Sequence, residues 1–114
     1  MKLKDIVEII DGQVICGHDR LNDEIDAGFA SDLMSDVLTL QNNKILLITG
    51  LINTQTIRTA EIADINHVLL VRKKKLLPEL LKLACDNNLI IIECTYSMFK
   101  TCGLLYKAGL KAVY

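Results

Sequence analysis

Four consecutive basic residues, Arg72-Lys73-Lys74-Lys75, form the longest run of like charge in the chain. Guanidinium and ammonium groups bind phosphates and carboxylates, so this run could contact a small anion or an acidic protein surface. Alternatively, it is a solvated turn whose charges keep the edge of an apolar sheet in water. We take Arg72 and Lys73, which directly follow an apolar run, as candidate ligand-binding residues.

A second polar segment stands before a predicted helix. Gly50 permits close approach of the backbone to a ligand, and Asn53, Thr54 and Thr56 lie where the helix opens. The free N–H groups and the dipole of a helix opening favour an anion, to which Arg58 could add charge. Alternatively, Asn53 or Thr54 only caps the helix. Neither GxGxxG nor GxxxxGK[ST] occurs in the sequence, so no phosphate-binding motif decides between these alternatives.

A third polar segment spans residues 94–97. Thr95 and Ser97 offer hydroxyl groups to a ligand, while Cys94 and Ser97 are also nucleophile types. A nucleophile needs an activating base, and His67, which opens a predicted strand, is not beside either residue in the sequence. Because we find no catalytic set, we predict that the protein is not an enzyme, with a small enzyme of unknown reaction as the alternative.

The carboxylates and cysteines lack the spacing of a metal site. Asp32 and Asp36 share one face of a predicted helix, but no further oxygen ligands stand nearby. The sequence has two His residues and four cysteines, and the cysteines form no CxxC pair. We predict no metal and no cofactor, and we expect Cys94 and Cys102 to be small, buried apolar residues.

Three aliphatic runs position the polar segments. The runs at 45–48, 68–71 and 89–92 are separated by helical patterns at 54–65 and 76–85. This order predicts two successive βαβ units with parallel strands. The three polar segments follow the carboxyl ends of these strands, so we expect them to lie side by side, where ligands bind in open parallel sheets.

The first part of the chain is predicted to add a helix over residues 3–10 and a short strand at 14–16. The alternation of residues 24–30 predicts a strand that extends the same sheet. A helix then opens at Ser31, which we interpret as its N-cap.

The last helix is predicted to begin at Ser97, an N-cap candidate, and to run to residue 105 or beyond. We expect Met98 and Phe99 to pack in the core. Alternatively, they pack against a second copy of the chain, in a patch widened by residues 104–106. Residues 111–114 form a short strand or a tail.

Composition narrows the class of protein. The 114 residues fit a single domain, 1–114, with 51% hydrophobic and 4% aromatic residues. The net charge of −1 shows no basic excess, so we expect no nucleic-acid partner. No apolar run reaches membrane-spanning length and the start does not resemble a signal peptide, so we predict a cytoplasmic protein.

Four segments resemble the DRTGG domain family, in particular its stand-alone members, which are found beside iron-hydrogenase genes in anaerobic bacteria. They cover much of the chain between residues 24 and 110. The segments are ASDLMSDVL at 30–38, LITGLINTQTIRTAE at 47–61, VLLVR at 68–72 and YSMFKTCG at 96–103.

The resemblance implies a three-layer α/β/α sandwich with a mostly parallel sheet, similar to the N-terminal domain of HPr kinase/phosphorylase. It also implies a homodimer and a regulatory role next to nucleotide-sensing CBS domains, without a family-wide catalytic activity. The chain departs from the motif that names the family. It has Leu51-Ile52-Asn53 where members carry Asp-Arg, and Arg72-Lys73-Lys74 where they carry Thr-Gly-Gly.

We therefore predict a non-catalytic regulatory or assembly domain that homodimerises and senses a small anionic metabolite or nucleotide at the three polar segments. The alternative is a scaffold or accessory factor that binds a redox enzyme of the iron-hydrogenase type.

Overall fold

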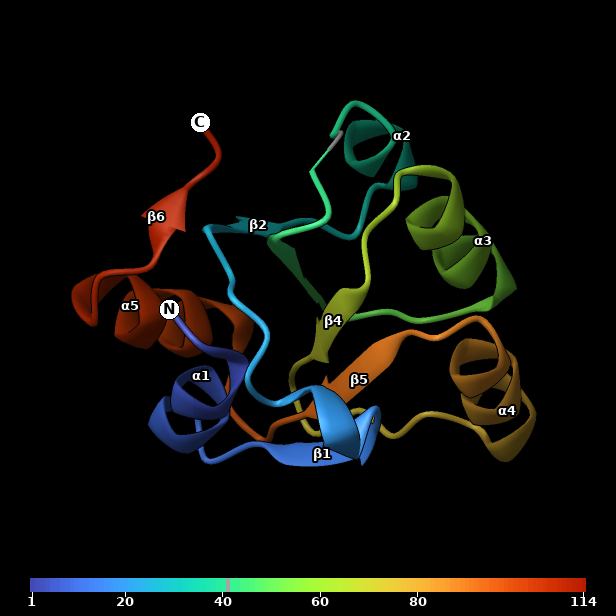
Figure 1. Ribbon diagram of the computed structural model, residues 1–114, viewed down its shortest axis with the longest axis horizontal. Helices are drawn as coiled ribbons and strands as arrows, with labels where there is room; N and C mark the ends of the chain where they lie inside the picture. Colours follow the sequence, from blue (N-terminus) through green and yellow to red (C-terminus); the bar gives the residue numbers. More distant parts are fainter. Residues whose placement is uncertain (41) are drawn as a thin grey trace.

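We describe the protein from a computed structural model, which covers residues 1–40 and 42–114. Within these residues a six-stranded sheet lies between two layers of helices (Figure 1). The strands are β1 (Gln13–Cys16), β2 (Ala27–Ala30), β3 (Ile45–Thr49), β4 (His67–Leu70), β5 (Ile90–Glu93) and β6 (Lys111–Ala112). The helices are α1 (Leu3–Ile9), α2 (Met34–Val37), α3 (Thr54–Ile62), α4 (Pro78–Asp86) and α5 (Met98–Lys107), with a 3-10 turn at His18–Arg20.

The strand order is β1-β5-β4-β3-β2-β6. Neighbours from β5 to β6 run parallel, whereas β1 runs antiparallel to β5 at one edge. The two predicted βαβ units are confirmed, as is the extension of the sheet by β2, although β2 begins at residue 27 rather than 24. The parallel strands therefore all end on one side of the sheet, which we call the carboxyl end, and all begin at the opposite amino end.

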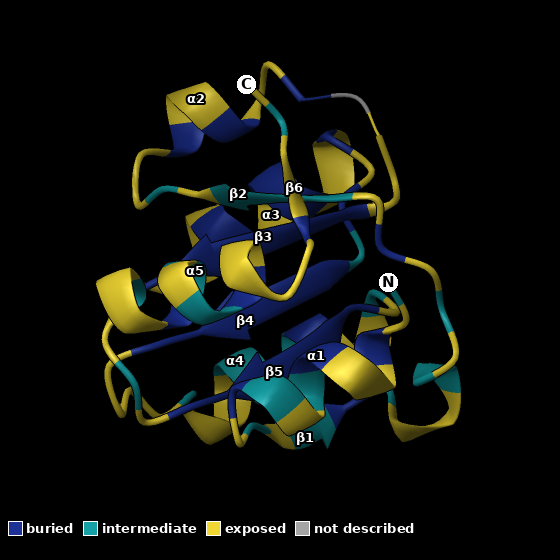
Figure 2. Ribbon diagram, turned by 90° about the vertical axis from the view of Figure 1, so that its left-hand side faces the viewer, coloured by how far each residue is buried: buried dark blue, intermediate teal, exposed yellow. Residues whose placement is uncertain are grey.

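Alternation along the strands sends apolar side chains to both faces of the sheet. Leu47, Leu70 and Ile91 pack with α2, α3 and α4 on one face. Leu46 and Leu69 pack with α1 and α5 on the other. Figure 2 shows the buried strands β3, β4 and β5 between helices whose outer surfaces are exposed, so the three-layer α/β/α sandwich is confirmed. None of the described helices has the length and apolarity needed to cross a membrane.

Local side-chain chemistry explains where the longer helices begin. Asn53 caps α3, since its Oδ1 accepts the N–H of Thr56 at 2.9 Å. Ser97 caps α5, since its Oγ accepts the N–H of Lys100 at 3.1 Å. Pro78 begins α4, where a missing N–H removes no intrahelical hydrogen bond. The caps predicted at Asn53 and Ser97 are confirmed.

The short helix α2 differs from its prediction. It begins at Met34 with Leu33 in the cap position, so the N-cap predicted at Ser31 is wrong. The Oγ of Ser31 instead accepts the N–H of Leu33 at 3.0 Å, in a turn that precedes the helix. Asp32 consequently lies outside the helix, and the predicted pairing of Asp32 with Asp36 on one helical face is wrong as well.

The exposed part of α5 also differs from its prediction. Phe99 is 90% exposed, so its predicted place in the core is wrong, although Met98 does pack against the core. Tyr106 is 72% exposed and Leu105 is buried, so only part of the predicted patch faces solvent. Phe99 and Tyr106 are two helical turns apart and share the face of α5 that borders the exposed part of β2, whereas Leu105 is buried in the core.

Candidate functional site

Backbone hydrogen bonds join the polar segments that follow β3, β4 and β5. The N–H of Arg72 donates to the carbonyl oxygen of Tyr96 at 2.8 Å, and the N–H of Val71 donates to that of Thr49 at 3.0 Å. The three segments therefore lie side by side at the carboxyl end of the sheet, as the parallel strands predicted (Figure 1).

A fourth turn, which follows β2, brings Asp32 to the same place. Its Oδ1 accepts the N–H of Gly50 at 2.7 Å and the hydroxyl of Thr49 at 2.8 Å. Its Oδ2 lies 3.7 Å from Nη2 of Arg72. The Gly50 N–H holds the pKa of Asp32 below its usual value against the opposing effect of burial, with help from Thr49 and Arg72. The side chain of Asp32 is therefore ionised near neutral pH, and the chain's own donor groups hold this negative charge at the carboxyl end of the sheet.

Arg72 lies directly over Gly50. Its Nη2 donates to the carbonyl oxygen of Gly50 at 3.1 Å. A Cβ built on residue 50 would overlap the guanidinium of Arg72. The absence of a side chain at Gly50 thus makes room for Arg72. The sequence had instead suggested that it makes room for a ligand.

The turn at residues 72–75, which follows β4 and which we call the β4 exit turn, has an unusual backbone. Arg72 and Lys73 have φ angles of 66° and 59°, in the left-handed region that costs non-glycine residues about 1–2 kcal/mol each. Hydrogen bonds to residues 94–97, which follow β5 and which we call the β5 exit turn, hold them there. The N–H of Lys73, for example, donates to the carbonyl oxygen of Cys94 at 3.2 Å. Both side chains are exposed. Strain of this kind concentrates at binding sites and turns that surrounding structure fixes.

The opening of α3 uses its own polar groups. Oδ1 of Asn53 takes the N–H of Thr56, and the N–H of Asn53 donates to Oγ1 of Thr56 at 3.2 Å. Thr56 is buried, whereas Thr54 and Arg58 are exposed. Asn53 and Thr56 therefore form a reciprocal cap, and Thr54 and Arg58 are the residues of this group that a ligand could reach.

The β5 exit turn contributes exposed hydroxyl groups and one cation. Thr95 and Ser97 are exposed, although Ser97 also caps α5. Nζ of Lys100 lies 3.9 Å from the ring centre of Tyr96, in a cation–π contact. Lys100 thus adds positive charge beside the β4 exit turn.

One member of the basic run is neutralised internally. Nζ of Lys75 donates to Oε1 of the buried Glu93 at 3.3 Å, and the N–H of Leu76 donates to Oε2 at 3.0 Å. Lys75 therefore fixes the turn before α4, and we do not count it with the cations open to a ligand.

Asp32 and Lys100 are the residues of this region that sequence reasoning missed. Asp32 was assigned to a helix because Leu33, Met34 and Val37 continue a helical pattern behind it. Its position just after a strand, like that of Gly50 and Arg72, was the available signal. Lys100 could not be found from spacing, because its place depends on the path of the β5 exit turn.

His67 lies at the opposite side of the molecule. It is the first residue of β4, whereas Cys94 and Ser97 follow the end of β5, so the fold separates this base from both nucleophile types. Nε2 of His67 lies 3.0 Å from Oδ2 of Asp23. Burial lowers the pKa of His67, and Asp23 opposes this only in part. His67 is therefore a neutral, buried residue near pH 7.

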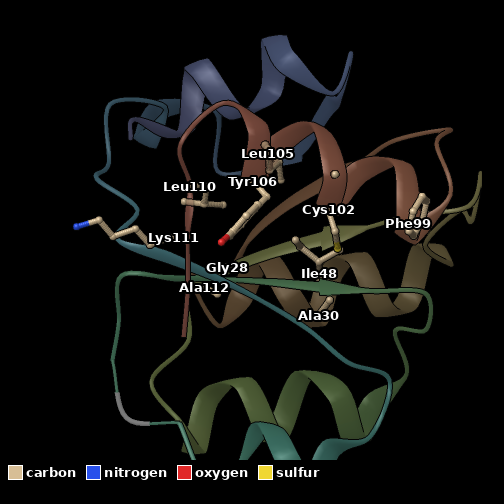
Figure 3. Close-up of a pocket in the computed structure, with 11 residues that line it drawn as sticks. Gly28, Ala30, Ile48, Phe99, Cys102, Leu105, Tyr106, Leu110, Lys111 and Ala112 are labelled. Carbon is tan, nitrogen blue, oxygen red and sulfur yellow. The ribbon is translucent and has the colours of Figure 1, made fainter. Parts of the chain in front are cut away.

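An apolar cleft of about 330 Å³ lies between α5 and the strands β2, β3 and β6 (Figure 3). The side chains of Cys102 and Tyr106 point from α5 toward Gly28, Ala30 and Ile48. Burial raises the pKa of the Cys102 thiol, which keeps it protonated near neutral pH. Cys102 was predicted to be buried but is only half-buried, while Cys94 is buried as predicted.

Comparisons with known proteins agree with this architecture. A model of the DRTGG domain family matches residues 5–108, whereas no curated protein sequence matches the chain. A solved structure of the CBS and DRTGG domains of the regulatory region of Clostridium perfringens pyrophosphatase, complexed with its activator diadenosine tetraphosphate, has a similar fold. The TM-score is 0.71 at 12% sequence identity, and the match covers 91% of this chain and 45% of that chain. Since the family model spans most of the sequence and the fold agrees, this chain belongs to the DRTGG domain family.

Proposed function

We propose that this regulatory domain senses a small anion, either a nucleotide or a phosphorylated metabolite, at the carboxyl end of its sheet. The supporting observation is that this end already holds one anion, the carboxylate of Asp32. The N–H of Gly50, the hydroxyl of Thr49 and the guanidinium of Arg72 surround that carboxylate. The same kinds of donor bind phosphate, so a phosphate that displaced Asp32 would meet groups suited to it.

The charge around this site favours such an exchange. No described residue forms an ion pair with Lys73 or Lys74, and Lys100 adds a third cation nearby. Phosphate carries more negative charge than the carboxylate of Asp32, so the exposed lysines attract it more strongly. Thr54, Thr95 and Ser97 are exposed hydroxyl donors at the same end of the sheet.

Displacement of Asp32 offers a way to transmit binding. Asp32 lies between β2 and α2, and only two residues separate β2 from Leu33. Release of its carboxylate would free this short segment and allow α2 to shift against α3. A domain that works in this way needs two arrangements of one surface and no reacting group, which fits regulation without catalysis.

Nucleotides are the first ligand class to examine, because the related pyrophosphatase region was solved with a dinucleotide activator. Inorganic phosphate and phosphorylated metabolites share the chemistry that the site would recognise. Ligands with several phosphates should bind most tightly if the exposed lysines contribute.

We also propose that the domain acts as a homodimer through the face of α5 that borders the apolar cleft. Phe99 and Tyr106 are exposed on this face, with the half-buried Cys102 and the exposed Gly103 between them. Aromatic side chains are enriched at protein interfaces. Replacing Phe99 with Glu should convert a dimer to a monomer, and a strictly monomeric wild-type chain at high micromolar concentration would instead favour a different partner, such as a redox enzyme.

A thermal-shift screen with nucleotides, phosphorylated metabolites and inorganic phosphate tests the ligand site. A ligand at 100 times its Kd adds about 2.7 kcal/mol to the free energy of unfolding. Lys73→Glu should remove most of that gain. Lys44→Glu is the matched control, because it makes the same charge change on an exposed side chain at the amino end of the sheet and should leave the gain intact.

Two results would contradict the ligand site. Absence of any stabilisation across the screen would favour an assembly role through α5. Equal stabilisation of the Lys73→Glu and wild-type proteins would place the anion elsewhere.

A further inference from the structure

Cys16 and Cys85 form a disulfide between the last residue of β1 and the last turn of α4. They are 69 residues apart in sequence, and their Cα atoms are 5.9 Å apart, within the usual range for a disulfide. Cys94 and Cys102 are free in the described part of the chain. The fold thus brings together two cysteines that no sequence motif connects.

The two cysteine residues differ in their exposure to solvent. Cys16 is 6% exposed, whereas Cys85 lies on the exposed side of α4. Both line a hollow of about 390 Å³ together with His18 and Arg20. Nη1 of Arg20 donates to the carbonyl oxygen of Asn88 at 2.8 Å, which fixes this cation close to the end of α4 that carries Cys85. Nε of Arg20 is also paired with Oδ2 of Asp23 at 3.2 Å, so we assign the attacking role to Cys85 from its exposure.

We propose that Cys16 and Cys85 are a reversible thiol–disulfide exchange site, with Cys85 as the residue that reacts with small disulfides from solution. The thiolate of Cys85 attacks a low-molecular-weight disulfide RSSR and forms a mixed disulfide, releasing one RS⁻. The thiolate of Cys16 then attacks Sγ of Cys85 and releases the second RS⁻. Overall, two protein thiols lose two electrons and two protons, and RSSR becomes two RSH.

When it is formed, the disulfide would hold one edge of the sheet in place. Within the described residues β1 pairs with a single strand, β5, and its pairing is interrupted between Val14 and Cys16. The disulfide ties this edge strand to α4. Cys16 pairs with Ile91, near the start of β5, so the disulfide lies toward the amino end of the sheet. The exchange site is therefore independent of the proposed anion site.

Mass spectrometry of the intact chain after reduction and exposure to oxidised glutathione tests the exchange. The wild-type chain should lose two hydrogens and give one cross-linked peptide pair that contains Cys16 and Cys85. Cys16→Ser should retain one glutathione on Cys85, because the second attack is removed. Cys102→Ser is the control and should behave as the wild type.

Melting temperatures test whether the disulfide stabilises the folded chain. The oxidised wild-type chain should melt at least about 5 °C above the reduced chain, because the cross-link closes a long loop. Cys85→Ser, which changes an exposed side chain and should fold normally, should abolish this difference. A stable glutathione adduct on the wild-type chain, a cross-link through Cys94 or Cys102, or equal melting temperatures would each overturn the proposal.

Discussion

The two ends of the sheet each pair an acid with a base, but burial gives the pairs different roles. At the carboxyl end, the side chains of Asp32 and Arg72 are about half exposed, and both contact the backbone of residue 50. At the amino end, the ring of His67 is only 4% exposed and lies against Asp23. Solvent reaches both members of the first pair, whereas in the second pair it reaches Asp23 but not the ring of His67. Accessibility, rather than pairing, therefore marks the candidate site.

The largest effect is expected from filling the space under Arg72. Gly50→Val should expel the guanidinium, since even a Cβ at residue 50 overlaps it. We expect little change in stability, because only the end of a half-exposed, flexible side chain has to move, but at least a tenfold loss of anion affinity, because the guanidinium leaves the site. Chemical denaturation and phosphate titration measure the two effects.

Gly103→Ala is the matched control for this change. No atom lies within 4 Å of a Cβ at residue 103. Alanine should therefore stabilise α5 by up to about 1 kcal/mol through its better helix propensity and leave anion binding unchanged. If Gly50→Val behaved in the same way, the contact between Arg72 and Gly50 would have no role in the site.

A smaller effect is expected from removing the internal anion. Asp32→Asn keeps an oxygen that can accept from Gly50 and Thr49 but removes the negative charge. If Asp32 competes with the ligand, affinity for inorganic phosphate should rise by up to about tenfold, which is about 1.4 kcal/mol, a typical upper range for one half-exposed charge. Isothermal titration calorimetry measures this change.

Asp36→Asn gives the comparison that Asp32→Asn requires. Asp36 is exposed in the neighbouring helix α2, so its substitution makes the same charge change without touching the Gly50 N–H. We expect its phosphate affinity to stay within about twofold of the wild type. Equal gains in both variants would mean that net charge, rather than displacement of Asp32, controls binding.

The sheet could be predicted from sequence because its strands are aliphatic runs buried on both faces. The runs that became β3, β4 and β5 allow little other than parallel strands joined by helices. Parallel strands in turn place their exit turns together, which is why Gly50, Arg72 and Thr95 were assigned to one region. These predictions depended only on hydrophobicity and chain order.

Side-chain contacts between distant segments could not be predicted in the same way. Asp32 meets Gly50 only because β2 and β3 are neighbours in a particular register. Cys16 meets Cys85 because β1 turns antiparallel at the far edge of the sheet. Phe99 was assigned to the core because it is a large apolar residue beside Met98, and only the orientation of α5 shows that it faces solvent. Each depends on tertiary placement, which periodicity does not encode.

The smallest expected effect is a pH dependence at the amino end. Burial lowers the pKa of His67 in the folded chain below its unfolded value of about 6.5, so the unfolded chain binds the proton more readily. Stability from this group is therefore complete above about pH 6.5 and is lost as the pH falls through the folded pKa. The lowered pKa of Asp32 acts at lower pH, since the contribution of this group to stability is complete above the ordinary carboxyl pKa of 3.8 and is lost only at more acidic pH. Urea unfolding at pH 7 and pH 5 should show that His67→Gln loses less stability than the wild type over this interval. An identical loss in both proteins would mean that His67 titrates normally, and the contrast between a buried and an accessible end of the sheet would then fail.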